Sequence, residues 1–89
     1  MIQGLDKLTR QLDEAGKAAE ALDGDLTTVN FDPSDAASVR TAVRQMERAV
    51  DDRLSRWRGN PLVDEMAKKT KAAMREQINA KARETRQEN

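Results

Sequence analysis

The chain has 89 residues, with 16 basic and 16 acidic side chains, which is enough for one small domain with a thin core. It has no cysteine and no histidine, which excludes disulfides, thiolate metal sites and catalysis by the usual general base. No apolar run reaches the ~20 residues of a membrane span, so we expect no membrane segment, no signal peptide and a cytoplasmic protein.

The first predicted element is a helix over about residues 3–23. Gly16 lies inside it at a cost of up to about 1 kcal/mol relative to alanine, and either permits close helix approach or marks a bend. Gly24 stands where a C-terminal cap is expected. The apolar residues step by three and four, as in a heptad seam: Leu5, Leu8, Leu12, Ala15, Ala19 and Leu22.

Residues 25–31 break the helical pattern and predict a short extended or β segment. Thr27, Val29 and Phe31 alternate with polar residues, and β-branched side chains dominate. A lone strand needs a partner for its backbone groups. Two arrangements stay open: a connector that crosses the helices with Val29 and Phe31 beneath it, or a ribbon paired with the same segment of a second copy.

A long central helix is predicted over about residues 33–58, which at 1.5 Å per residue would be about 39 Å long. Asp32 is expected to cap it, with Pro33 at the first helical position and Asp35 in the first turn. One face of this helix carries an apolar stripe, which the helix can bury only against the flanking segments. The stripe consists of Ala36, Val39, Val43, Met46, Val50, Leu54 and Trp57.

The turn after this helix predicts a long antiparallel helical hairpin. Gly59 can end one helix, Asn60 can cap the next, and Pro61 can begin it. The third helix is expected over about residues 61–83, followed by a frayed polar tail at 84–89. Its expected apolar face comprises Leu62, Val63, Met66, Ala67, Ala73, Met74 and Ile78. The fold class is therefore mainly α, as a single domain over residues 1–89.

We expect the chain to self-associate, because only 20 of its 89 residues are large and apolar and so small a core buries little apolar surface. We expect a homo-oligomer, with a dimer as the first expectation. Phe31 and Trp57 fit a core role first and an exposed anchor second. The candidate interface residues are Leu5, Leu8, Leu12, Val29, Phe31, Val43, Met46, Val50 and Trp57.

Charge is unevenly spread, with net −4 over residues 1–32 and net +2 over each of 33–58 and 59–89. The simplest interpretation is an acidic first segment that lies against basic later ones. The alternative is a small nucleic-acid-binding protein, although no aromatic residue interleaves with the basic ones to stack on bases. Its candidate residues are Arg40, Arg44, Arg48, Lys68, Lys69, Lys71 and Arg75.

No residue constellation indicates catalysis, a cofactor or a metal. Ser34 and Ser55 have no histidine to activate them. Asp23, Asp25 and Asp32 do not have the spacing of a calcium-binding loop, and turn or cap chemistry explains them. We therefore expect a protein that is not an enzyme.

Three segments resemble small phage and prophage proteins from the head-completion and tail-assembly gene region. They are Gly-Leu-Asp-Lys-Leu-Thr-Arg-Gln-Leu at residues 4–12, Val-Asn-Phe-Asp-Pro at 29–33 and Gly-Asn-Pro-Leu at 59–62. The resemblance implies a structural or assembly role and other phage structural proteins as partners. It also implies a location in the cytoplasm of a bacterial host or in the virion.

A second resemblance concerns Trp57, Arg58 and Gly59, which stand between two predicted helices. They are similar to the Trp-x-Gly turn of small helical-hairpin proteins exported by type VII secretion. The chain departs from that family in its additional N-terminal helix and in having no tyrosine, which removes the tyrosine-based export signal.

Overall fold

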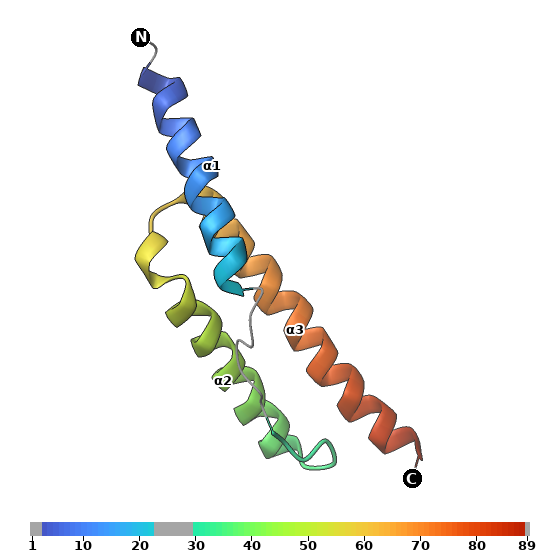
Figure 1. The fold of residues 1–89 in the computed structure, drawn as a ribbon. Helices are drawn as coiled ribbons and strands as arrows, with labels where there is room; N and C mark the ends of the chain where they lie inside the picture. The colour runs from blue at the N-terminus through green and yellow to red at the C-terminus, as the bar shows by residue number, and fades with distance from the viewer. Residues whose placement is uncertain (1–2, 23–29, 89) are drawn as a thin grey trace.

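A computed structural model describes residues 3–22 and 30–88 of the chain. These residues contain three α-helices and one short 3-10 helix and no strand, so the expectation of a mainly α fold is confirmed. The molecule is elongated, with extents of 64 × 19 × 18 Å (Figure 1). The elements are α1 (Gln3–Leu22), α2 (Ala36–Arg53), η1 (Ser55–Trp57) and α3 (Pro61–Glu88).

The three α-helices lie along the long axis of the molecule, as Figure 1 shows. α2 runs toward η1, and α3 runs back from it beside α2, which gives these two helices the largest shared contact. α1 packs on both, but its first turns extend beyond the turn that joins η1 to α3. The N-terminal half of α1 therefore has less of its own chain to pack against.

The core lies between α2 and its two neighbours. Met46 and Val50 of α2 and Val63 of α3 are fully buried, and each buried side chain of this size contributes about 1.5–3 kcal/mol. α1 supplies only the small Ala18 to the fully buried set. The predicted central stripe is confirmed at four positions, Val39, Met46, Val50 and Leu54, while Val43 and Trp57 are half-buried and Ala36 is exposed.

The start of α2 differs from the prediction, because Asp35 and not Asp32 is the cap. The Asp35 carboxylate accepts from the backbone N–H of Ala37 at 3.0 Å. Asp32 instead begins the preceding turn, where its Oδ1 accepts from the Ser34 N–H at 2.9 Å and from the Ser34 hydroxyl at 2.6 Å. Pro33 lies in this turn, a position that its fixed φ favours. These bonds from Ser34 lower the pKa of the Asp32 carboxyl.

The end of α2 also differs from the prediction, since the helix stops at Arg53 and not near residue 58. The hydroxyl of Ser55 donates to the Asp52 carbonyl at 2.9 Å, and residues 55–57 tighten into η1. Gly59 has a φ of 95°, in the left-handed region that glycine adopts without strain. Gly59 therefore has the left-handed conformation predicted for it, but it does not end the central helix, which stops at Arg53 with Leu54 as its C-cap.

α3 is longer than predicted. It continues to Glu88, past the expected end at residue 83, so the prediction of a frayed tail over 84–89 is wrong for the described part. Ala82 is buried at 4% exposure, so α3 contributes to the core as far as this residue. Two members of its predicted apolar face, Leu62 and Ala73, are exposed instead.

The predicted extended segment lies mostly outside the described residues. That includes Val29 and the cap expected at Gly24. Phe31, which follows them, is half-buried and packs against the core in a stretch without regular secondary structure. This matches the core role expected for its ring.

Candidate functional site

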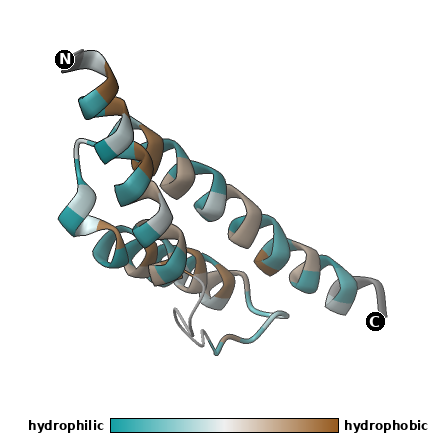
Figure 2. Cartoon of the chain, turned by 45° about the horizontal axis from the view of Figure 1, so that its top comes forward, coloured by the Kyte–Doolittle hydropathy of each residue, from teal (hydrophilic) through white to brown (hydrophobic). Residues whose placement is uncertain are grey.

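Three leucines of α1 stay exposed in a protein with few large apolar residues. Leu5, Leu8 and Leu12 are 56%, 46% and 57% exposed, whereas Ala18 of the same helix is completely buried. With about 100° of rotation per residue, the three leucines point about 80–140° away from Ala18. Figure 2 shows hydrophobic residues, in brown, along the N-terminal half of α1.

We define the leucine face as Leu5, Leu8, Leu12, Gly16 and Ala19, all of which are exposed. It carries no charge. The charged residues of α1 lie on the other side, between about 200° and 340° from Ala18: Asp6, Lys7, Arg10, Asp13, Glu14, Lys17 and Glu20. A Cβ built on Gly16 would meet no atom within 4 Å among residues 3–22 and 30–88, so none of these residues requires glycine there.

The other predicted interface residues are placed differently. Met46 and Val50 are fully buried in the chain's own core, which corrects their assignment to an interface, since core residues cannot contact a partner. Phe31, Val43 and Trp57 are half-buried and pack against that core. Val29 lies outside the described residues.

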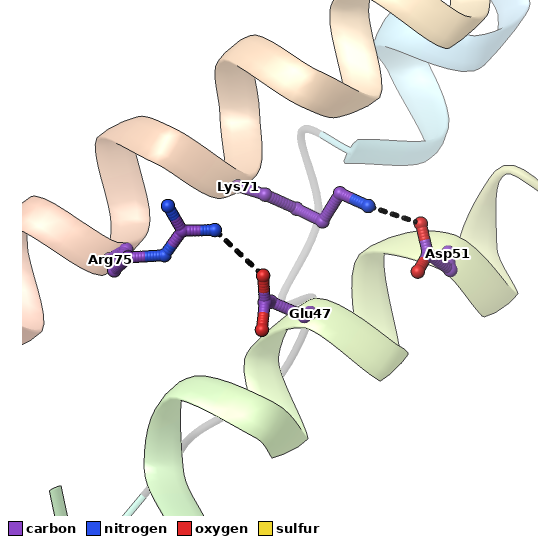
Figure 3. Close-up of polar contacts among 4 residues, drawn as sticks. All are labelled: Glu47, Asp51, Lys71 and Arg75. Carbon is purple, nitrogen blue, oxygen red and sulfur yellow. Dashed lines mark hydrogen bonds and ion pairs between the residues drawn. The ribbon is translucent and has the colours of Figure 1, made fainter. Parts of the chain in front are cut away.

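Two of the seven predicted nucleic-acid residues take part in ion pairs between α2 and α3. Arg75 pairs with Glu47 at 2.7 Å, and Lys71 pairs with Asp51 at 2.9 Å (Figure 3). These pairs neutralise part of the expected basic surface. The remaining five residues are exposed: Arg40, Arg44, Arg48, Lys68 and Lys69.

A hollow of about 300 Å³ lies where α1 meets the turn between η1 and α3. We name it the basic pocket after four of its lining residues: Lys7, Arg10, Arg56 and Arg58. Trp57 also lines it, and the Arg56 guanidinium lies 5.5 Å from the centroid of that ring. This site could not be predicted from the sequence, because it joins residues about 50 positions apart. The local signal was the tryptophan between two arginines.

Asn60 holds the two sides of the basic pocket together. Its Nδ2 donates to the Gln11 carbonyl at 3.2 Å and to Glu14 Oε1 at 2.9 Å. Its Oδ1 accepts from the N–H groups of Leu62 at 2.9 Å and Val63 at 3.4 Å, so it caps α3 as predicted. The residue is only 6% exposed. One side chain therefore fixes α1 across the beginning of α3.

A protein-family model described as YuaX matches residues 2–89. The chain belongs to the YuaX family. A relative from Escherichia coli (strain K12), described as the uncharacterized protein YuaX, is 39% identical over 87 residues, which are 98% of this chain and 90% of the relative. No solved structure matches the chain.

The description of the YuaX family names no ligand, partner or reaction. The function of this chain is therefore inferred from its surface. Within residues 3–22 and 30–88, no helix combines the length and apolarity needed to cross a membrane. Among the same residues, no group of three or more Asp, Glu, His or Cys side chains lies close enough together to hold a metal ion. The leucine face and the basic pocket are the two features that stand out.

Proposed function

We propose that this YuaX-family chain is a non-enzymatic interaction protein that acts through helix packing as a homo-oligomer. The observation that carries the proposal is the exposure of Leu5, Leu8 and Leu12 on one uncharged side of α1. Full burial of a leucine contributes about 1.5–3 kcal/mol, and about half of this remains to be gained at each position. A second copy of the leucine face would supply that burial.

The size pattern of the leucine face supports an antiparallel dimer. Large side chains occupy its first half, and small ones, Gly16 and Ala19, occupy its second half. In an antiparallel pair centred on Leu12, Leu8 of one copy faces Gly16 of the other, and Leu5 faces Ala19. A two-fold interface needs this kind of self-complementary patch. Gly16 then lets the helices approach closely, which offsets its cost in helix stability.

One effect opposes this dimer. Asp13 and Glu20 border the leucine face, and two copies would bring these carboxylates closer together. Repulsion between exposed charges is at most about 1 kcal/mol and is screened by salt. Asp13 also has a cation beside it, since Lys17 Nζ lies 3.3 Å from its Oδ2. Burial of six leucines in the dimer outweighs this term, and added salt should strengthen the association.

Two finer features of the fold belong to the same proposal. In it, α2 and α3 form the antiparallel hairpin expected from the sequence and act as a rigid support for α1. The extended segment expected over residues 25–31, of which the structure describes only Asn30 and Phe31, would either cross the helices as a connector or pair with the same segment of a second copy.

The test is the absolute mass measured by light scattering across a concentration series. We expect the unaltered chain to pass from monomer to dimer, and Leu8→Glu to stay monomeric with unchanged helix content by circular dichroism. Leu62→Glu is the matched control, because Leu62 is an exposed leucine of α3. A monomer at every concentration, or a Leu8→Glu dimer as tight as the original, would overturn the proposal.

The biological setting is a separate proposal that rests on the sequence resemblance alone. It is phage or prophage assembly, with other phage structural proteins as partners, in the bacterial cytoplasm or the virion. Mass spectrometry of particles and assembly intermediates from an induced host tests it. Peptides of this chain are expected there, and their absence from both fractions would contradict the setting while leaving the dimer untouched.

A further inference from the structure

We propose that the basic pocket binds a phosphate-bearing anion. The pocket lies on the charged side of α1, away from the leucine face, so this site is independent of the proposed dimer. It is formed by three parts of the chain: the middle of α1, η1 with the turn after it, and the residue that caps α3.

The pocket holds an uncompensated positive charge. Lys7, Arg10, Arg56 and Arg58 line the pocket against a single carboxylate, that of Glu14. Among the described residues none of these four cations forms an ion pair, although four other cations of the chain do. Like charges gathered in one hollow repel each other, so an anion is the partner that this arrangement favours.

The carboxylates near the pocket already have other partners. Glu14 Oε1 accepts the hydrogen bond from Asn60 Nδ2. Arg58 also borders a neighbouring hollow with Asp51 and Asp64, but it forms an ion pair with neither, and Asp51 pairs with Lys71 instead. The positive charge of the pocket is therefore left for a ligand.

The side chains that line the pocket indicate which kind of anion it binds. Arginine presents a planar fork of donors that matches two phosphate oxygens at once, and three of the four cations are arginines. A phosphate group has more acceptor oxygens than a carboxylate and uses several such donors together. The volume of about 300 Å³ is at the small end of ligand sites, which suits one or a few linked phosphates. Both a small phosphorylated molecule and the backbone of a nucleic acid carry this group.

The chain offers a built-in probe for this pocket. Trp57 is the one tryptophan of the chain, and there is no tyrosine, so the intrinsic fluorescence comes from a residue that lines the pocket. We expect sodium pyrophosphate to change Trp57 emission in a saturable way at low salt, with weaker binding as chloride is added. Sodium acetate at equal ionic strength is the control and should have little effect.

Variants distinguish binding in the basic pocket from a general attraction of anions to the positive charges of the protein. Arg10→Gln and Arg58→Gln should each weaken pyrophosphate binding by about tenfold or more, since each removes a charged donor. Arg48→Gln is the matched control, because Arg48 is an exposed arginine of α2 that does not line the pocket. It should leave affinity unchanged. Circular dichroism checks that each variant is folded.

A parallel titration with a short single-stranded oligonucleotide distinguishes the two sources of phosphate. If the affinity for pyrophosphate equals or exceeds the affinity for the oligonucleotide, the ligand is a small phosphorylated molecule. Oligonucleotide binding that is much tighter and equally sensitive to Arg10→Gln identifies a nucleic-acid backbone. No emission change with either probe, or equal losses in Arg48→Gln and Arg58→Gln, would overturn the proposal.

Discussion

The side-chain amide of Asn60 donates to Glu14 Oε1 across 2.9 Å, and this bond connects the beginning of α3 to the middle of α1. The same amide reaches the Gln11 carbonyl at 3.2 Å. Because Asn60 is nearly buried, its four hydrogen bonds replace water that would otherwise solvate these groups. It fixes the angle at which α1 leaves the bundle, and therefore positions both the leucine face and the basic pocket.

Asn60→Ala is expected to destabilise the protein by about 2–3 kcal/mol, since it removes the α3 cap and both bonds to α1. Urea unfolding followed by circular dichroism measures the change. Asn60→Ser is the comparison, because serine restores a capping oxygen without an amide that reaches α1, and should recover about 1 kcal/mol. Equal losses in the two variants would mean that the cap contributes nothing here.

Gly16→Leu is expected to have opposite effects on the monomer and on the dimer. Nothing lies within 4 Å of the added Cβ, and leucine favours a helix over glycine by about 0.5–1 kcal/mol, so the monomer should melt at a higher temperature. In the antiparallel dimer the new side chain would collide with Leu8 of the second copy. Thermal melting at low concentration and light scattering at high concentration measure the two effects.

The same substitution at Gly4 is the control for this experiment. Gly4 is also open to solvent in α1 but does not belong to the leucine face. Gly4→Leu should not weaken association. If Gly16→Leu dimerises as strongly as the original chain, the helices do not meet at Gly16 and the antiparallel packing is wrong.

The periodic parts of the fold could be predicted from the sequence. Steps of three and four residues predicted a central helix and its buried Val39, Met46 and Val50, although not the ends of α2, since one helix face must meet the rest of the bundle. Asn60 before Pro61 gave the start of α3, because cap chemistry is local. These features depend only on neighbours in the chain.

Features that depend on the distance between helices could not be predicted. The apolar arc of α1 is wide enough to face two directions, and only the packing determines that Ala18 turns inward while Leu12 stays outside. The basic pocket needs Lys7 to meet Arg58, which follows from where α1 crosses the turn. At the start of α2, Asp32 and Asp35 were both able to cap, and the turn bonds to Ser34 decided between them.

The turn at Asp32 gives a prediction about pH. Its hydrogen bonds from Ser34 favour the ionised carboxylate and hold the pKa of Asp32 below its ordinary value of 3.8. A carboxyl with a lower pKa in the folded state stabilises the fold above the unfolded pKa, and this stabilisation is lost as pH falls through the folded pKa. Titration followed by carbon-detected NMR should show the low pKa in the original chain. Ser34→Ala removes the hydroxyl bond and keeps the backbone N–H bond, so the pKa should move only part of the way back toward 3.8. An unchanged pKa would mean that the hydroxyl bond does not form in solution.

The direction of α1 pairing can be read by disulfide trapping, because the chain contains no cysteine of its own. In the antiparallel dimer, residue 5 of one copy lies beside residue 19 of the other, while the two copies of residue 5 are about 21 Å apart along the helices. A disulfide needs Cα atoms within about 7 Å. Leu5→Cys and Ala19→Cys should therefore cross-link when mixed and oxidised, and neither should do so alone. A parallel dimer reverses this pattern, with each variant linking to itself. Lys17→Cys, on the charged side of α1, is the control that should remain unlinked in both arrangements.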